Sequence, residues 1–438
     1  MKKIALATLF CALCLSSAFC DSPFFSGYAG LLGDFTGDKE ETTKLEPEFT
    51  MQGFLAAQID WNGKLIFRGD FHIKSANLFN PANSPLKPTT ENTEFKIGEL
   101  SLTFRASSAS VSHYISAFFG KFEPVGSDVF LQRHLGLQPI SSILTENWGG
   151  LVGTSIFSNY GLGLSYTAHF NKSFVMGAYI YAYDSENGTF TINSFNTELR
   201  AAGTFPFIIF DVSANFSFEF ATGKSLYESD PTLYAGIKDD LLLVRSALFK
   251  LGANILIGNR YTTSVLVQAG INNLSLGGAE HKQITGKDIY LLVEPRINLG
   301  ATQMSIAVFS LPNENVRDLL YLRGYARGAT NSEENGNVGA NVSFKNDSVY
   351  LGATQLTWGV NVTACYDSNL ISLVNTIASG SFDIKNMHLY VTPFASMPLF
   401  GGEFKAALSL DPLALASITE NKNWLRIFDA FVGFKVSM

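Results

Sequence analysis

Residues 208–220 read IIFDVSANFSFEF, and this stretch decides the fold class. Every second residue from Ile208 to Phe220 is apolar, and from Asp211 to Glu219 each residue between them is polar. A period of two is that of a β-strand with one apolar and one polar face, whereas a helix would show a period near 3.6. The alternation also runs longer than a usual soluble strand, and it matches the length of a tilted membrane-spanning strand.

The same alternation recurs along the chain at residues 162–170, 289–299 and 356–366. Asn62-Gly63 and Gly258-Asn259 separate such segments with tight turns, and Asn-Gly is the pair that a type I′ hairpin prefers. Longer polar stretches lie between other segments, at residues 78–91, 123–148, 221–238, 274–287, 312–337 and 411–423. Short turns and long loops are typical of outer-membrane barrels. We therefore predict one transmembrane antiparallel β-barrel of about 16 strands, within a range of 14 to 20, with short periplasmic turns and long extracellular loops.

Composition supports this class and excludes others. Of the 438 residues, 46% are hydrophobic and 16% are charged, against about 25% charged in average globular chains. We find no uninterrupted apolar run of 18 residues after the N-terminal segment, which excludes a helical membrane protein. The 31 Lys and Arg against 38 Asp and Glu give a net charge of −7, which argues against nucleic acid as a partner. The remaining alternative is a secreted β-sandwich or β-helix, although such folds use shorter strands and more surface charge.

The first twenty residues have the organisation of a secretory signal peptide. Lys2 and Lys3 precede the apolar run 4–15, and small residues then mark cleavage after Ala18 or after Cys20. Phe19 before the cysteine disfavours a lipoprotein site. We therefore predict export, a signal peptide at residues 1–20 and a single barrel domain at residues 21–438.

Residues 428–438 read FDAFVGFKVSM and form another alternating segment. The segment resembles the terminal β-signal of Gram-negative and spirochaete outer-membrane β-barrel proteins, with Met438 where that family usually has Phe. That resemblance implies a membrane-insertion signal on the apolar face, at Phe428, Val432, Phe434, Val436 and Met438. This porin-like resemblance points to no particular subfamily. It implies the bacterial outer membrane, its lipid and the barrel-assembly machinery as surroundings and partners, and a homotrimer is one assembly open to such a barrel.

With the apolar face toward lipid, the polar face meets the lumen. The residues predicted to line a pore are Arg68, Asp70, Lys74, Glu294 and Arg296. Rows of both charge signs favour small polar solutes in a water-filled barrel. The alternative is that these charges neutralise one another in a plugged interior.

The stretch 123–148 is too apolar for a loop in water. It resembles the inward-folded constriction loop of general porins, and that resemblance implies Asp128, Arg133, His134 and Glu146 at the constriction. The alternative is a loop packed on the barrel rim. In the stretch 312–337, the spacing of Arg317, Arg323 and Arg327 suits a short helix that plugs or caps the barrel.

The sequence therefore predicts a porin-like channel for passive diffusion of small hydrophilic solutes. Two alternatives are an adhesin or surface antigen whose barrel anchors its loops, and a transporter of hydrophobic substrates of the fatty-acid type. Phosphate-binding Gly loops of the Walker type, HExxH and CxxC are absent from the sequence, and the six His residues are scattered. No enzyme activity, metal or cofactor is predicted.

Overall fold

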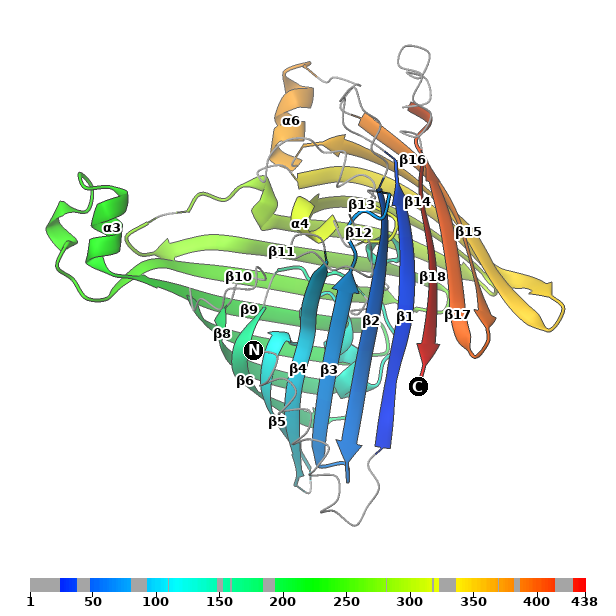
Figure 1. Ribbon diagram of the computed structural model, residues 1–438, viewed down its shortest axis with the longest axis horizontal. Coiled ribbons are helices and arrows are strands. Elements are labelled where there is room, and N and C mark those ends of the chain that lie inside the picture. Colours follow the sequence, from blue (N-terminus) through cyan, green and yellow to red (C-terminus); the bar gives the residue numbers. More distant parts are fainter. Residues whose placement is uncertain are drawn as a thin grey trace.

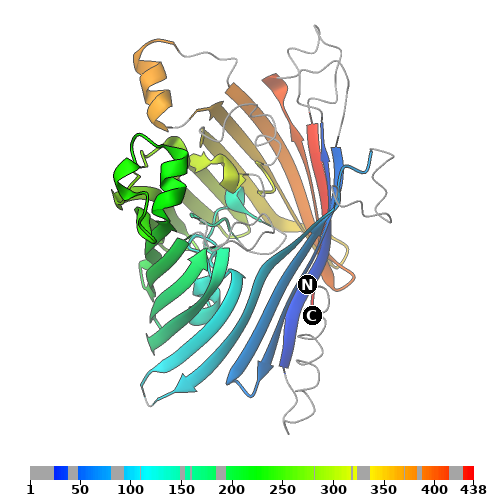
Figure 2. The same cartoon turned by 60° about the vertical axis from the view of Figure 1, so that its left-hand side comes forward.

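The computed structural model describes residues 24–37, 48–79, 93–108, 110–147, 153–157, 160–183, 194–280, 282–316, 319–322, 336–368, 370–381, 387–413 and 428–438. These residues form one antiparallel sheet of 18 strands that closes on itself (Figures 1 and 2). Each strand pairs with its neighbours in sequence, and β18 pairs with β1 to seal the barrel. The predicted signal peptide, residues 1–20, lies outside the described residues.

The strands are long enough to cross a bilayer at a tilt. Their bounds are β1 (Phe24–Thr36), β2 (Glu48–Trp61), β3 (Leu65–Lys74), β4 (Glu94–Ser107), β5 (Ser112–Lys121), β6 (Tyr160–Asn171), β7 (Phe174–Tyr183), β8 (Ser194–Phe205), β9 (Ile208–Ala221), β10 (Leu243–Gly258), β11 (Thr263–Gly277), β12 (Ile289–Leu299), β13 (Thr302–Pro312), β14 (Gly336–Leu351), β15 (Thr354–Asp367), β16 (Met387–Leu399), β17 (Gly402–Leu410) and β18 (Phe428–Ser437).

The all-β antiparallel barrel is confirmed, but the strand number of about 16 is wrong, because the barrel has 18. Strand β7 shows why the count came out low. Its lumen-facing positions include Val175, Tyr179 and Tyr181, which are buried against other side chains inside the barrel. Both faces of β7 are therefore apolar or aromatic, and a period of two gives little signal there.

Turn lengths alternate strictly around the barrel. Each even-numbered strand joins the next through a short turn, and each odd-numbered strand joins the next through a longer connection. Asn62 and Gly63, between β2 and β3, have φ angles of 55° and 62°, as a type I′ turn requires. All long connections therefore leave from the same end of the barrel.

Several long connections contain helices. They are α2 (Val129–Leu135), α3 (Gly223–Ser229), α4 (Asn313–Val316) and α6 (Leu370–Ala378), with 3-10 turns η2 (Ile143–Thr145), η3 (Ala235–Ile237) and η4 (Gly286–Asp288). The arm that carries α3 and η3, between β9 and β10, projects away from the barrel (Figure 1). In the described part of the chain, no helix combines the length and apolar character needed to cross a membrane.

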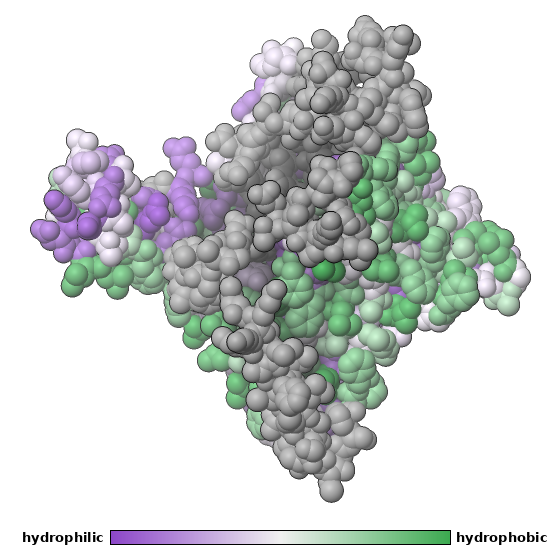
Figure 3. All heavy atoms as spheres, in the orientation of Figure 1, coloured by the Kyte–Doolittle hydropathy of each residue, from purple (hydrophilic) through white to green (hydrophobic). Residues whose placement is uncertain are grey.

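The outer face of the barrel is apolar. Leu164 is 62% exposed and Leu199 58%, whereas the polar residues next to them, Ser165, Glu198 and Arg200, point inward and are buried. Apolar side chains cover much of the described barrel surface in Figure 3. In a closed barrel every backbone group of the wall pairs with a neighbouring strand, so such a surface is compatible with lipid. The alternation of β9 is confirmed, since Asp211 and Asn215 are fully buried and Phe220 is exposed.

Strand β18 follows the predicted alternation. Val432 and Met438 are about half exposed, whereas Asp429 and Phe431 are buried toward the lumen. The strand pairs along its length with β17 and β1, so its apolar residues belong to the outer wall on both sides of the seam.

Candidate pore and its inward loop

The connection between β5 and β6 folds into the barrel, and we call its described residues, 122–147 and 153–157, the inward loop. Phe130, Leu131 and Leu144 on this loop are fully buried. They belong to a cluster of buried apolar residues that includes Tyr179 of β7 and Leu266 of β11 on the inner wall. The apolar character of this loop is thus accounted for by burial inside the lumen.

Helix α2 of the inward loop begins after Asp128 and ends before Gly136, and both flanking residues are left-handed, with φ angles of 65° and 64°. The Asp128 carboxylate accepts hydrogen bonds from the backbone N–H of Ile140 (2.9 Å) and Ser141 (2.6 Å). It also accepts one from Asn254 of β10 (2.8 Å). Asp128 is fully buried, so it holds the loop in shape and ties it to the wall.

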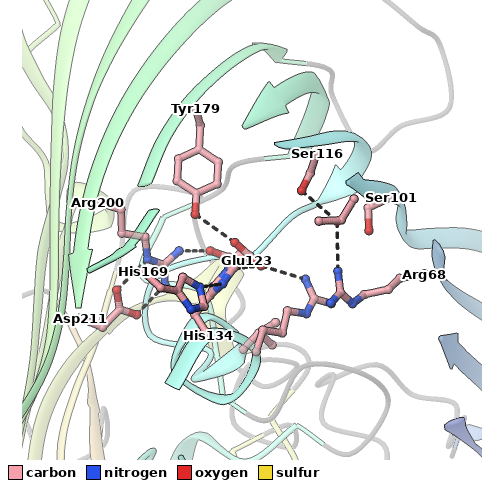
Figure 4. A network of polar contacts seen from close by, with 12 residues as sticks. Arg68, Ser101, Ser116, Glu123, His134, His169, Tyr179, Arg200 and Asp211 are labelled. Carbon is pink, nitrogen blue, oxygen red and sulfur yellow. Dashed lines mark hydrogen bonds and ion pairs between the residues drawn. The ribbon is translucent and has the colours of Figure 1, made fainter. Parts of the chain in front are cut away.

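Glu123, at the start of the loop, is the centre of a buried polar network (Figure 4). Its Oε1 lies 3.0 Å from Nε2 of His134 and 3.5 Å from Nη1 of Arg133. The hydroxyl of Tyr179 donates to its Oε2 over 3.0 Å. Burial alone raises the pKa of Glu123, but the charges of His134 and Arg133 outweigh it and hold the pKa well below its usual range.

His134 extends this network to β6. Its Nδ1 lies 2.8 Å from Nε2 of His169 (Figure 4). The His169 ring stacks on Tyr114 with centroids 4.4 Å apart. Arg133 reaches the other way, and its Nη2 donates to Oε2 of Glu99 on β4 over 2.8 Å. The end of α2 is therefore tied to β4 and β6 through charged and aromatic groups.

On the β8–β9 side the loop meets a buried ion pair. Arg200 and Asp211 are joined by Nη2–Oδ2 and Nε–Oδ1 contacts of 2.5 Å and 2.7 Å, and both side chains are fully buried. Arg200 also donates to the backbone carbonyl of Glu123 and lies 4.3 Å from the ring centroid of Phe130. The two opposite charges on this side of the wall thus pair with each other, and the loop covers Arg200.

The far end of the loop reaches β12 and β17. Glu294 bonds Nε of Arg296 over 2.5 Å and accepts a hydrogen bond from Ser142. Glu146 accepts two hydrogen bonds of 2.6 Å from Nζ of Lys405. The inward loop therefore crosses the lumen, with anchors on opposite parts of the wall.

Space remains between α2 and strands β1–β5. One cavity of about 390 Å³ is lined by Arg68, Arg105, Glu123, Arg133 and His134 together with mainly polar neighbours. A second cavity, of about 200 Å³, is lined among others by Asp70 and Glu99. Both have Gln58, Arg68, Gln132 and Arg133 in their linings. We call the two cavities together the α2 passage.

The predicted pore and constriction residues fall into two groups. Arg68, Asp70, Arg133 and His134 line the α2 passage. Asp128, Glu146 and Glu294 instead bond other side chains or the loop backbone, and Arg296 lines a different cavity. Lys74 lies at the end of β3, opposite Gln52, and is not among the residues lining the described cavities. Arg317, Arg323 and Arg327 lie outside the described residues.

Sequence reasoning missed several residues of the network, namely Glu99, Glu123, Tyr179 and Lys405. Glu123 stands at the first position of the predicted loop, and that was its one signal. Within the described part of the chain, no group of three or more His, Cys, Asp or Glu is placed to hold a metal ion.

No protein-family model matches the chain, and no curated protein does. The barrel itself decides the fold, since 18 closed antiparallel strands fall in the size class of porins. The chain has a porin-like β-barrel fold. Among solved structures it is similar to OccAB3 of Acinetobacter baumannii, at 10% identity over 94% of this chain and 99% of that one, with a TM-score of 0.49.

The barrel is also similar to the outer membrane protein OpdK of Pseudomonas aeruginosa, at 9% identity over 95% and 99% of the two chains, with a TM-score of 0.49. OmpF of Salmonella typhi, in complex with daunomycin, matches at 11% identity over 94% and 97%, with a TM-score of 0.40. The strand pairing described above, rather than these distant similarities, carries the argument about the fold.

Proposed function

We propose that this barrel is an outer-membrane channel through which small hydrophilic solutes diffuse passively. The observation that carries the proposal is the α2 passage, whose two cavities share four polar lining residues. Arg68, Arg133 and Glu99 bring both charge signs to its wall. A wall of this kind suits hydrated polar solutes better than apolar ones.

The inward loop sets the width of the proposed channel. It fills the lumen between α2 and the β7–β12 side with buried apolar and ion-paired groups. Solutes would therefore pass on the β1–β5 side. The predicted roles of Arg68 and Asp70 as lining residues, and of Arg133 and His134 as constriction residues, remain part of this proposal.

The test is single-channel recording of the refolded barrel in a planar bilayer. We expect stable conductance steps that scale with salt concentration, as a water-filled passage requires. A correctly folded barrel that stays silent would contradict the channel.

The outer-membrane location and the exposure of the long connections outside the cell are also proposals. They are supported by the apolar outer face and by the alternating terminal strand. Replacing Phe434 and Met438 by Ser should lower the amount of barrel assembled in the outer membrane. Leu408→Ser, on the outer face of the neighbouring strand β17, is the control. Equal assembly of both variants would remove the insertion signal from β18. Assistance by the barrel-assembly machinery and a homotrimer stay predictions.

A second candidate is the adhesin, and the α3 arm favours it. This arm projects from the barrel and exposes Leu233 (67%), Leu241 (90%) and Leu242 (69%). Deleting residues 224–242 should then abolish binding to host or neighbouring cells while leaving conductance unchanged. Unchanged cell binding would contradict the adhesin.

The hydrophobic-substrate alternative gains no such support, because polar side chains predominate in the lining of the larger cavity of the α2 passage.

A further inference from the structure

A third cavity lies on the opposite side of the inward loop from the α2 passage. Its volume is about 180 Å³, and it is enclosed by Pro139 to Ser141 of the loop and by strands β10 to β13. Arg260 comes from the turn between β10 and β11, and Asn298 and Gln303 flank the turn between β12 and β13. The cavity therefore lies near the short-turn end of the barrel.

Arg296 is held rigidly at this cavity. Its Nε bonds Glu294 over 2.5 Å, and its Nη1 donates to the carbonyl of Ile140 over 2.7 Å. The residue is only 8% exposed, and its Nη2 is buried with no hydrogen-bond partner among the described residues. A buried guanidinium N–H without an acceptor is costly, and a fixed one is ready to donate to a ligand.

A second donor faces the same cavity without a partner. The hydroxyl of Ser264 on β11 is buried, and its Oγ bonds no group in the part of the chain that the structure describes. Arg260 adds positive charge, and it donates to the carbonyls of Gln138 and Pro139 over 3.3 Å. The cavity thus combines two guanidinium groups and a hydroxyl.

The charge balance of the cavity favours an anion. Among the described residues, Glu294 is the acidic residue that Arg296 contacts, and both of its carboxylate oxygens are occupied, by Arg296 and by Ser142. Arg260 has no acidic partner among its bonds to the described residues, which go to backbone carbonyls. One positive charge is therefore left over. At about 30 Å³ for each water in the liquid, a volume of about 180 Å³ admits a small oxyanion with some water.

We propose that this cavity is a binding site for a small oxyanion, held by Arg296, Ser264 and Arg260. A phosphate and a carboxylate present the same acceptor oxygens, and a bidentate guanidinium contact suits either. An anion bound here would also join the inward loop to the wall, because Arg296 and Arg260 contact the loop backbone at residues 138–140. The site requires the folded barrel but not an open channel.

The test is titration of the full-length barrel in detergent micelles with inorganic phosphate and, separately, with acetate. Binding is followed by calorimetry and by broadening of the ³¹P or ¹³C resonance of the anion. Ser264→Ala removes an unpartnered donor and no contact of the loop, so it should fold normally. We expect it to weaken binding about tenfold, the usual effect of losing a hydrogen bond to a charged group.

Ser343→Ala is the matched control, because Ser343 is another buried serine on the lumen side, on β14. It should bind as the unaltered protein does. Arg260→Gln should weaken binding by at least as much as Ser264→Ala, and, if it does not fold, the Ser264 comparison still decides. Saturable binding of phosphate alone, of acetate alone or of both supports the site and identifies the class of anion.

Absence of saturable binding of either anion, or equal binding by the Ser264→Ala and Ser343→Ala variants, would overturn the proposal. These readouts do not depend on conductance. A silent barrel that binds the anion would refute only the channel, and a conducting barrel that does not bind it would refute only this site.

Discussion

Two sides of the same lumen differ in what the inward loop does to the charges of the wall. On the β8–β9 side, Arg200 and Asp211 form an ion pair with no solvent exposure and contact the loop directly. On the β2–β4 side, among the described residues, Arg68 bonds the neutral side chains of Gln58 (2.7 Å) and Thr103 (3.3 Å), beside a cavity. Strands of the same polar-inward pattern therefore line a packed interior in one place and a cavity in the other. The loop makes this difference, because it packs against one side and leaves space beside the other.

The largest effect is expected when one member of the buried pair Arg200–Asp211 is removed. Arg200→Met leaves Asp211 charged and unpaired in the interior, and we expect the free energy of unfolding to fall by about 3–5 kcal/mol. Arg68→Met, on the side that borders the α2 passage, should lower the free energy of unfolding by less than about 1.5 kcal/mol. Denaturant unfolding followed by gel migration of the heated and unheated barrel measures both.

Equal losses for these two variants would show that the two sides do not differ energetically. The double variant Arg200→Met/Asp211→Leu is a further control. It should recover most of the loss, because no uncompensated charge is left in the interior.

A second test uses the carboxylate at the entry of the loop. The pKa of Glu123 is lowered in the folded barrel, so its charge stabilises the fold above its unfolded value, about 4.3. This contribution is lost as the pH falls below that value toward the lower folded pKa. Loop attachment, measured as resistance of the loop to protease, should therefore weaken once the pH falls below about 4.3.

Glu123→Gln supplies the reference for that test. The variant should be less stable at pH 7 by about 1–3 kcal/mol, since it leaves buried donors and charges without their acceptor. It should also lose less stability than the unaltered barrel between pH 5 and pH 3. The same acid dependence in both proteins would mean that other carboxylates control loop attachment.

A smaller effect is expected at the far anchor of the loop. Glu146→Gln weakens the ion pair with Lys405 and should loosen the loop where it meets β17. We expect a cost of about 1 kcal/mol and a higher, noisier single-channel current. Glu228→Gln, on the exposed helix α3, should change neither. A quieter or lower current in the Glu146 variant would show that this anchor does not restrict the passage.

The smallest effect should come from the charges of the passage itself. Arg68→Gln removes a positive charge from the wall of the α2 passage, so the ratio of cation to anion permeability should rise about twofold. Lys74→Gln, on the same strand but not in the lining of that passage, should change the ratio less. Reversal potentials under a salt gradient measure both, and a larger effect of Lys74 would mean that solutes take another route.

Much of the fold could be predicted because lipid and lumen impose a period of two on each strand. The inward and outward faces of β9, β12, β15 and β18 follow directly from the alternation. The predicted number of strands was too low, because apolar and aromatic side chains also face inward where the barrel interior is packed. Tyr179 and Tyr181 of β7 pack inside the barrel, so the pattern of that strand no longer distinguishes its faces.

The inward loop could be recognised by its apolar residues, but its partners could not. Whether Glu123 meets Tyr179 or Glu146 meets Lys405 depends on the stagger of strands around the closed barrel and on the path of the loop across it. Those contacts join residues 56 and 259 positions apart, and no local pattern carries that information. Arg133 and His134 were predicted at the constriction only from the resemblance of this loop to the constriction loop of general porins, and not from any contact that they make.

The seam between β1 and β18 has a consequence for the order of folding. It joins residues at opposite ends of the barrel domain, with Leu31 opposite Phe434, and contacts so distant in sequence form slowly. We therefore expect the inward loop to enter the lumen before this last pairing is complete. Cys365, the one cysteine outside residues 1–20, is buried on the lumen side of β15. Its thiol should react with a maleimide while the seam is open and become inaccessible once the barrel has closed. The loss of maleimide reactivity over time would therefore measure the rate of barrel closure.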